Sequence, residues 1–131
     1  MLDEQDLQQE RKWYYEQAAQ RCVSALKKNN INAWYAPERN EARSKALELI
    51  PEGATIGIGD SVTLHQVGII QELESKGQHQ VFNPFLRGEN GEFGIDGREL
   101  IGVMKKALTA EVFLLGTNAI TLDGKLVNID G

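Results

Sequence analysis

The sequence has little cysteine, no long apolar run and no excess of positive charge, and each shortage excludes a class of protein. A single cysteine, Cys22, excludes an internal disulfide, and alone it cannot hold zinc or an iron–sulfur cluster, which need several ligands. No apolar run approaches the roughly 20 residues of a membrane-spanning helix, and the amino terminus lacks a signal-peptide core. With 14 basic and 19 acidic side chains, the net charge of -5 gives no attraction to phosphate backbones. We therefore expect a cytoplasmic protein that binds neither nucleic acid nor membrane and holds no metal or cofactor of its own.

What is present is an ordinary globular composition. Hydrophobic residues make up 41% of the 131 residues and charged residues 25%, which excludes a disordered or fibrous chain. This length suits one domain with a hydrophobic core and is too short to indicate two domains. We expect residues 1–131 to form a single domain.

The first third of the chain predicts helix, strand and helix. Residues 3–29 contain no Gly or Pro and carry an apolar stripe (Leu7, Tyr14, Ala18, Cys22 and Ala25), which predicts a long amphipathic helix with Cys22 as a small core residue. The alternating segment INAWYA (31–36) predicts a strand. Asn40 is placed to cap a helix that runs to Pro51.

The middle of the chain predicts a βαβ unit. Residues 54–58 read as a strand, the apolar spacing after them predicts one helix up to Gly77, and QVFNPF (80–85) reads as a second strand. Two such strands run parallel and are joined by a right-handed crossover. The fold class is therefore α/β, with a mainly parallel sheet flanked by helices.

The last third begins with a glycine-rich loop, from Arg87 to Gly97. Asp96, with Glu99 three positions later, resembles a capping box that opens a helix to Leu108. The unbroken apolar run VFLLG (112–116) predicts a central strand that is covered on both faces. Asp123 and Gly124, between two β-like runs, predict a carboxyl-terminal β-hairpin with a two-residue turn.

Polar and small residues follow the predicted strand 54–58 directly. In an open α/β sheet, ligands bind outside the carboxyl ends of the strands, so Gly59, Asp60 and Ser61 are candidate binding residues. Glycine allows close approach of an anion, whereas Asp60 repels a phosphate and favours a hydroxyl-rich ligand such as a sugar or polyol. The alternative is a tight strand-to-helix turn capped by Asp60 or Ser61.

Further candidates lie in the next turn and after the apolar strand. His65 falls in the first turn of the following helix and could act as an acid or base, although an exposed helix histidine is the common case. Thr117 and Asn118 stand at the carboxyl end of the run VFLLG, and Asp123 completes the group. Turn chemistry alone explains Asp123. Arg87 could clamp a carboxylate or phosphate, with a solvated loop arginine as the alternative.

Three stretches resemble one protein family. GIGDSVTLHQVGIIQEL, MKKALTAEVFLLGTNAIT and, above all, DGKLVNIDG are similar to the LUD domain family of lactate-utilisation proteins. The resemblance implies a fold similar to ribose-5-phosphate isomerase, glucosamine-6-phosphate deaminase and the CoA transferases. It also implies a link to lactate oxidation beside iron–sulfur partner subunits, so that any cluster lies in those partners or in a segment outside this chain.

The resemblance also implies departures from the family pattern. Relatives continue beyond the NIDG motif, so the chain is expected to be shortened at its carboxyl end, with an open sheet edge that a homodimer covers. Asn118 cannot act as a general base, and no glutamate matches the one that CoA transferases use.

Three hypotheses of function follow. The first is an accessory or ligand-binding component of lactate or organic-acid metabolism. The second is an enzyme that acts on a sugar phosphate or acyl-CoA at the strand ends. The third is a structural remnant without activity.

Overall fold

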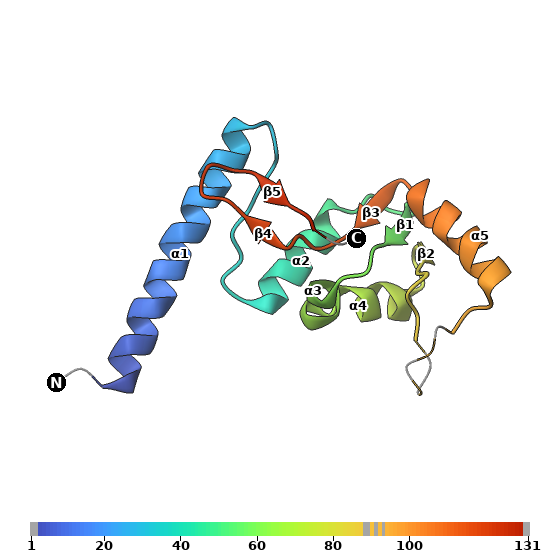
Figure 1. Ribbon diagram of the computed structural model, residues 1–131, viewed down its shortest axis with the longest axis horizontal. Helices are drawn as coiled ribbons and strands as arrows, with labels where there is room; N and C mark the ends of the chain where they lie inside the picture. Colours follow the sequence, from blue (N-terminus) through green and yellow to red (C-terminus); the bar gives the residue numbers. More distant parts are fainter. Residues whose placement is uncertain (1–2, 88–89, 91, 93, 130–131) are drawn as a thin grey trace. The chain divides into compact units, whose positions relative to one another are not determined.

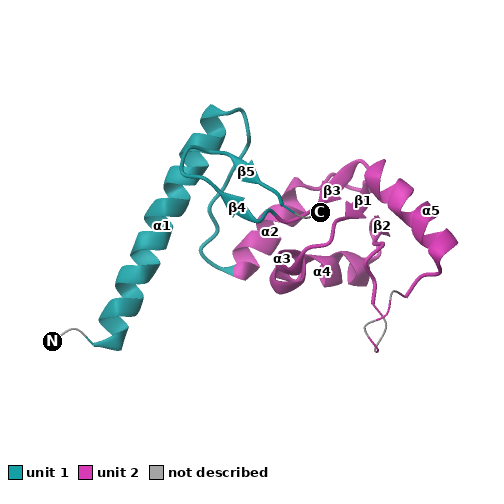
Figure 2. Ribbon diagram, viewed as in Figure 1, with its two compact units in different colours: residues 1–38, 117–130 teal, residues 39–116, 131 magenta. Residues whose placement is uncertain are grey.

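The computed structural model describes residues 3–87, 90, 92 and 94–129, and these residues fall into two compact units (Figures 1 and 2). Unit 1 comprises the described residues of 3–38 and 117–129, and unit 2 comprises those of 39–116. Within the described part of the chain, no helix is both long and apolar enough to span a membrane.

Unit 2 is built on a parallel three-stranded sheet. Its strands are β1 (Thr55–Ile58), β2 (Gln80–Phe82) and β3 (Val112–Leu114), in the order β2-β1-β3. The pairing of β1 with β2 is parallel and confirms the predicted βαβ unit. The predicted position of the apolar run 112–116 is wrong, because β1 is the central strand and β3 lies at the edge of the sheet formed by the described residues. Consistently, Phe113 and Leu115 are partly exposed.

The two faces of β1 have different partners. Ile56 and Ile58 are fully buried in a cluster with Ile50, Ile69 and Leu73, residues that come from or follow α2 (Arg39–Leu49) and α4 (Ile69–Lys76). Gly57 points the other way, toward α5 (Gly97–Leu108) and the ring of Phe113. The sheet of unit 2 is therefore flanked by helices on both faces, as expected for the predicted α/β class.

The single helix predicted between β1 and Gly77 is in fact two helices. Helix α3 (Val62–Val67) ends and α4 begins at Gly68, whose φ of 79° is left-handed. The Gly68 amide still donates to the carbonyls of Leu64 and His65, so the break is a capped turn. The guanidinium of Arg43, from α2, donates to the Val67 carbonyl at 3.3 Å and holds the corner. The apolar spacing continues from α3 through Gly68 into α4, which is why the sequence predicts one helix instead of two.

Smaller differences concern element ends. Helix α2 starts at Arg39, so Asn40 lies inside the helix instead of capping it, and its side chain accepts from Arg43. Strand β2 stops at Phe82, because the Asn83 side chain accepts from the Phe85 amide and turns the chain. Asp96 is the N-cap of α5, as predicted, but its side chain accepts from the neighbouring Gly97 amide and not in the predicted capping-box pattern with Glu99. In the predicted loop 87–97, residues 88, 89, 91 and 93 lie outside the described residues.

Unit 1 consists of a long helix, an extended segment and a hairpin. Helix α1 (Glu4–Lys28) confirms the prediction for residues 3–29, with Asp3 and Asp6 forming a capping box at its start. The strand predicted at residues 31–36 is wrong. Ala33 is buried as the alternation suggested, but the segment pairs with no strand among the described residues, and a strand needs a partner for its backbone groups.

The predicted hairpin is present, with strands β4 (Ala119–Ile120) and β5 (Leu126–Val127) antiparallel. Its turn is longer than the predicted two residues. The Gly124 amide donates to the Thr121 carbonyl, and the Thr121 amide donates to the Lys125 carbonyl, which leaves three residues in the loop. Gly124 occupies the left-handed position at φ 83°.

Candidate functional site

The carboxyl ends of β1 and β3 lie side by side in unit 2. The Gly59 amide donates to the Leu114 carbonyl at 2.8 Å, which extends the strand pairing by one residue. Gly116 lies against Ser61 so closely that a Cβ on Gly116 would stand 2.5 Å from Ser61 Oγ. We call Gly59–Ser61 and Leu115–Gly116 the strand-end segments, because they form the edge where parallel sheets place ligands.

The glycines of this edge have packing roles. A Cβ at Gly57 would stand 2.1 Å from the Ala107 carbonyl oxygen, so glycine is what lets α5 lie on the sheet. A Cβ at Gly59 would stand 3.0 Å from Leu115 Cβ and 3.3 Å from the Phe113 ring. Both positions face the same side of β1, since side chains alternate along a strand. Close packing therefore accounts for the GIG sequence without a ligand.

Ser61, not Asp60, caps the helix that follows β1. Ser61 has an extended backbone, its Oγ accepts from the Leu64 amide at 3.4 Å, and it is only 8% exposed. Asp60 is exposed at the same edge, and His65 is exposed on α3. The strand-to-helix turn thus takes the capped form that the sequence offered as the alternative, while leaving the Asp60 carboxylate in solvent.

Thr117 and Asn118 belong to unit 1, where they tie the open end of the hairpin. The Thr117 hydroxyl donates to the Val127 carbonyl at 3.0 Å, and the backbone amide of Asn118 donates to the same oxygen at 3.1 Å. Asn118 Oδ1 accepts from the Ile129 amide at 2.9 Å. These polar groups satisfy hairpin backbone, which is a structural reason for a Thr-Asn pair at this point.

Asp123 lies at the other end of the hairpin, in its turn. Its carboxylate accepts a short hydrogen bond from the Thr121 hydroxyl and pairs with Lys125 Nζ at 3.1 Å. The Thr121 hydrogen bond, followed by Lys125, lowers the pKa of the Asp123 carboxyl below its ordinary value. The predicted site residues come from both units. Gly59, Asp60, Ser61 and His65 lie in unit 2, whereas Thr117, Asn118 and Asp123 lie in unit 1, with Asp123 a hairpin's length from the other two.

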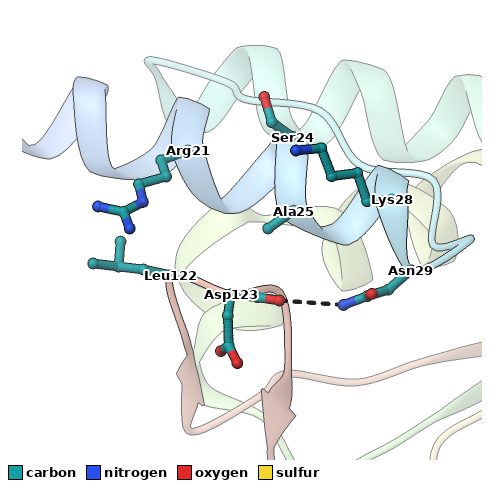
Figure 3. Close-up of a pocket in the computed structure, with 7 residues that line it drawn as sticks. All are labelled: Arg21, Ser24, Ala25, Lys28, Asn29, Leu122 and Asp123. Atoms are coloured by element: carbon teal, nitrogen blue, oxygen red, sulfur yellow. Dashed lines mark hydrogen bonds between the residues drawn. The ribbon is translucent and has the colours of Figure 1, made fainter.

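Sequence reasoning missed a shallow depression of about 330 Å³ in unit 1 (Figure 3). It lies between the last turns of α1 and the hairpin turn, and Asn29 Nδ2 joins the helix to the turn by donating to the carbonyls of Asp123 and Gly124. Arg21, Ser24 and Lys28 line it at the i, i+3, i+7 spacing of one helix face, a signal that could have found it.

A metal site is not formed by the described residues. Across residues 3–87, 90, 92 and 94–129, no three His, Cys, Asp or Glu side chains are grouped so that they could hold a metal ion. Cys22 is half-buried in α1, where its Sγ contacts the Thr121 carbonyl at 3.6 Å, in line with the predicted packing role.

Comparison with known protein families shows to which family the chain belongs. The family model described as the LUD domain matches residues 19–131, most of the chain and parts of both units. The chain belongs to the LUD domain family. A search of the curated proteins and a search of the solved structures each found no match to it.

The LUD match includes the stretches on which the resemblance in the sequence was based. The described part of the DGKLVNIDG stretch contains the hairpin turn and β5, and its first glycine, Gly124, lies where a Cβ would stand 2.6–2.8 Å from the α1 backbone at Ala25 and Leu26. This stretch, which lies within the LUD match, thus docks the hairpin on the helix. The LUD match begins within α1, so the first part of that helix, up to residue 18, lies outside it.

Proposed function

We propose that this LUD protein is an accessory, non-catalytic component of lactate or related organic-acid utilisation, which acts through protein contacts. Membership of the LUD family supports the metabolic setting. The observation that carries the accessory role is that four of the polar side chains nominated for chemistry are bonded within the fold, whereas Asp60 and His65 are exposed. Ser61 caps α3, Thr117 and Asn118 hold the hairpin, and Asp123 pairs with Thr121 and Lys125.

A catalytic site needs a base or nucleophile whose reacting atom is available to substrate. The Thr117 hydroxyl and Asn118 Oδ1 would each give up a hairpin hydrogen bond to contact a ligand, and Ser61 Oγ would release the first turn of α3. The low pKa of Asp123 favours its ionised form, but the carboxylate is held by a hydroxyl and an ammonium group of its own turn. Such groups stabilise a fold better than they perform proton transfer.

Redox chemistry in this proposal belongs to iron–sulfur partner proteins, and this chain supplies a contact surface to them. The parallel βαβ unit is compatible with the fold of ribose-5-phosphate isomerase, glucosamine-6-phosphate deaminase and the CoA transferases, which we propose as its wider class. We further infer that residues 1–131 act as one domain, because the LUD match includes parts of both units.

Genetic complementation tests the proposal. Deletion of the encoding gene is expected to impair growth on lactate, and the chain carrying both Asp60→Ala and Asn118→Ala is expected to restore that growth. Iron content and visible absorbance of the protein isolated from lactate-grown cells would report iron–sulfur partners. Loss of growth with the double variant, while its circular dichroism and melting temperature stay those of a folded protein, would overturn the accessory role.

A ligand-binding or enzymatic role is the second candidate, and one observation favours it. The Asp60 carboxylate is exposed at the carboxyl end of the central strand, the usual ligand position in a parallel sheet. Thermal-shift titrations with lactate, sugar phosphates and CoA esters separate the two candidates, because a ligand specific to the folded state raises the melting temperature. A saturable rise that disappears in Asp60→Ala would favour this second role.

A further inference from the structure

The first half of α1 exposes large apolar side chains that no described residue of unit 1 covers. Leu7 is 48% exposed, and Trp13 and Tyr14 are each 64% exposed, whereas Ala18, Cys22 and Ala25 farther along are partly buried. The hairpin lies against the second half of α1, where Thr121 contacts Cys22, Gly124 lies against the backbone at Ala25, and Asn29 donates to the turn. The apolar stripe of this helix is therefore covered at its carboxyl end and open at its amino end.

The open part of the stripe lies on one face of the helix. Leu7 and Tyr14 are seven residues, or two turns, apart, and Glu10 and Arg11 lie between them within about 60° of the same face. Lys12 lies about 140–160° around the helix from both apolar side chains. Its Nζ is 3.9 Å from Glu38 Oε1, so the chain near Glu38 lies on the side of α1 opposite to Leu7 and Tyr14. The face formed by Leu7, Glu10, Arg11 and Tyr14, here called the α1 face, is left accessible in unit 1.

Charge is distributed unevenly along the same half of the helix. The sequence from 3 to 10 contains four acidic residues and no basic residue, and Arg11 and Lys12 follow directly. A second α1 helix placed parallel to the first would bring the two acidic stretches together, and like charges at that distance repel. Placed antiparallel about a point between residues 10 and 11, the helices bring Glu10 of each copy to Arg11 of the other, and the remaining acidic residues of the stretch face uncharged residues.

We propose that the α1 face is a dimerisation surface whose occupant is the α1 face of a second copy of this chain, in antiparallel orientation. A two-fold axis between residues 10 and 11 sets Leu7 of each copy against Tyr14 of the other. The same register sets Glu10 of each copy against Arg11 of the other. One surface then pairs with itself in both its apolar contacts and its charges, which is what a two-fold interface requires. This proposal is independent of the proposed function and of the sheet edge.

The interface is small, so the dimer forms reversibly with concentration. Sedimentation equilibrium of the full chain over a wide concentration range is expected to show a monomer–dimer equilibrium. Leu7→Gln and Tyr14→Gln should each weaken it at least about tenfold, since each removes two apolar contacts by symmetry. Leu86→Gln is the matched control, because Leu86 is similarly exposed at 46% but lies in unit 2, and it should leave the equilibrium unchanged.

Charge reversal tests the register. Glu10→Arg alone and Arg11→Glu alone each place like charges opposite one another and should weaken the dimer, whereas the chain carrying both changes restores the opposite pairs and should regain it. Orientation is tested in a Cys22→Ser background, in which a mixture of Leu7→Cys and Tyr14→Cys chains should form mixed disulfides in preference to either homodimer.

Three results overturn the proposal. The first is a monomer at every concentration, with Leu7→Gln lowering the melting temperature, which would mean that the chain covers its own stripe. The second is a dimer that withstands Leu7→Gln and both single charge reversals, which would place the contact elsewhere, such as at the β3 edge. The third is cross-linking of like with like, which would make the helices parallel. Far-ultraviolet circular dichroism of each variant confirms that α1 remains folded.

Discussion

At the residue scale, two glycines at α5 are expected to have opposite effects on stability: Gly57, against which the helix packs, and Gly102, which lies inside it. Gly57→Ala is expected to lower the free energy of unfolding by about 2–3 kcal/mol, because its Cβ would overlap the Ala107 carbonyl and push α5 off the sheet. Gly102→Ala, inside α5 with open space around its Cβ, is expected to raise it by about 0.5–1 kcal/mol through helix propensity. Urea titrations of both variants check the two signs. Equal effects would mean that α5 does not lie against Gly57.

The lowered pKa of Asp123 gives the hairpin a pH dependence. A carboxyl whose pKa is lower in the folded state stabilises that state above its unfolded pKa, and the stabilisation disappears as the pH falls through the folded value. Thr121→Val removes the largest cause and should raise the pKa of Asp123 toward the ordinary aspartate range, whereas Thr121→Ser keeps a hydroxyl and should hold it low. Carbon-detected NMR titration of Asp123 measures both, and an unchanged pKa in Thr121→Val would refute the assignment.

At the element scale, the attachment of the hairpin to α1 depends on Gly124. Gly124→Ala meets two obstacles, a φ of 83° and a Cβ within 2.8 Å of the α1 backbone, and should destabilise unit 1 by about 3 kcal/mol. Gly77→Ala has the first obstacle alone, at φ 61° with nothing near its Cβ, and should lose about 1 kcal/mol. Thermal unfolding followed by circular dichroism gives both values. Similar losses would mean that the backbone angle, not the docking, decides.

The elements that the sequence predicted well are those whose signals are local. Helix α1 has an uninterrupted pattern and a capping residue, α5 has Asp96, and the hairpin has a glycine at a turn, so each was placed near its observed bounds. The βαβ unit followed from strand and helix alternating over a short span. Local preference and the final fold agree at these points.

The errors arose where a distant partner decides the outcome. The alternation in residues 31–36 buries Ala33 but cannot supply a neighbouring strand, and the apolar run at β3 cannot reveal that β1 takes the centre of the sheet. Gly68 looked like a helix residue because Arg43, from another helix, helps to fix the corner. For the site, position at strand ends was predictable, but the hydrogen bonds that engage Thr117 and Asn118 depend on β5, ten residues later.

At the scale of the whole molecule, the two units differ in how much apolar surface they bury. Unit 2 contains a cluster of seven buried residues around Ile56 and Ile58. In unit 1, the buried apolar side chains of the described residues are Leu26 and Ala33. Burial of apolar surface is the main stabilising term, so unit 2 is expected to be the more stable of the two.

This difference predicts how the chain opens. Ile56→Ala should lower the stability of unit 2 by about 2–5 kcal/mol and speed amide hydrogen exchange in β1, while exchange at Thr121 and Gly124 in the hairpin stays unchanged, because those amides open through unit 1 alone. Leu26→Ala should give the reverse pattern. NMR-detected exchange resolves the individual amides. If instead Ile56→Ala speeds β1 and the hairpin by the same factor, the units unfold as one, and residues 1–131 form the single cooperative domain that composition and length predict.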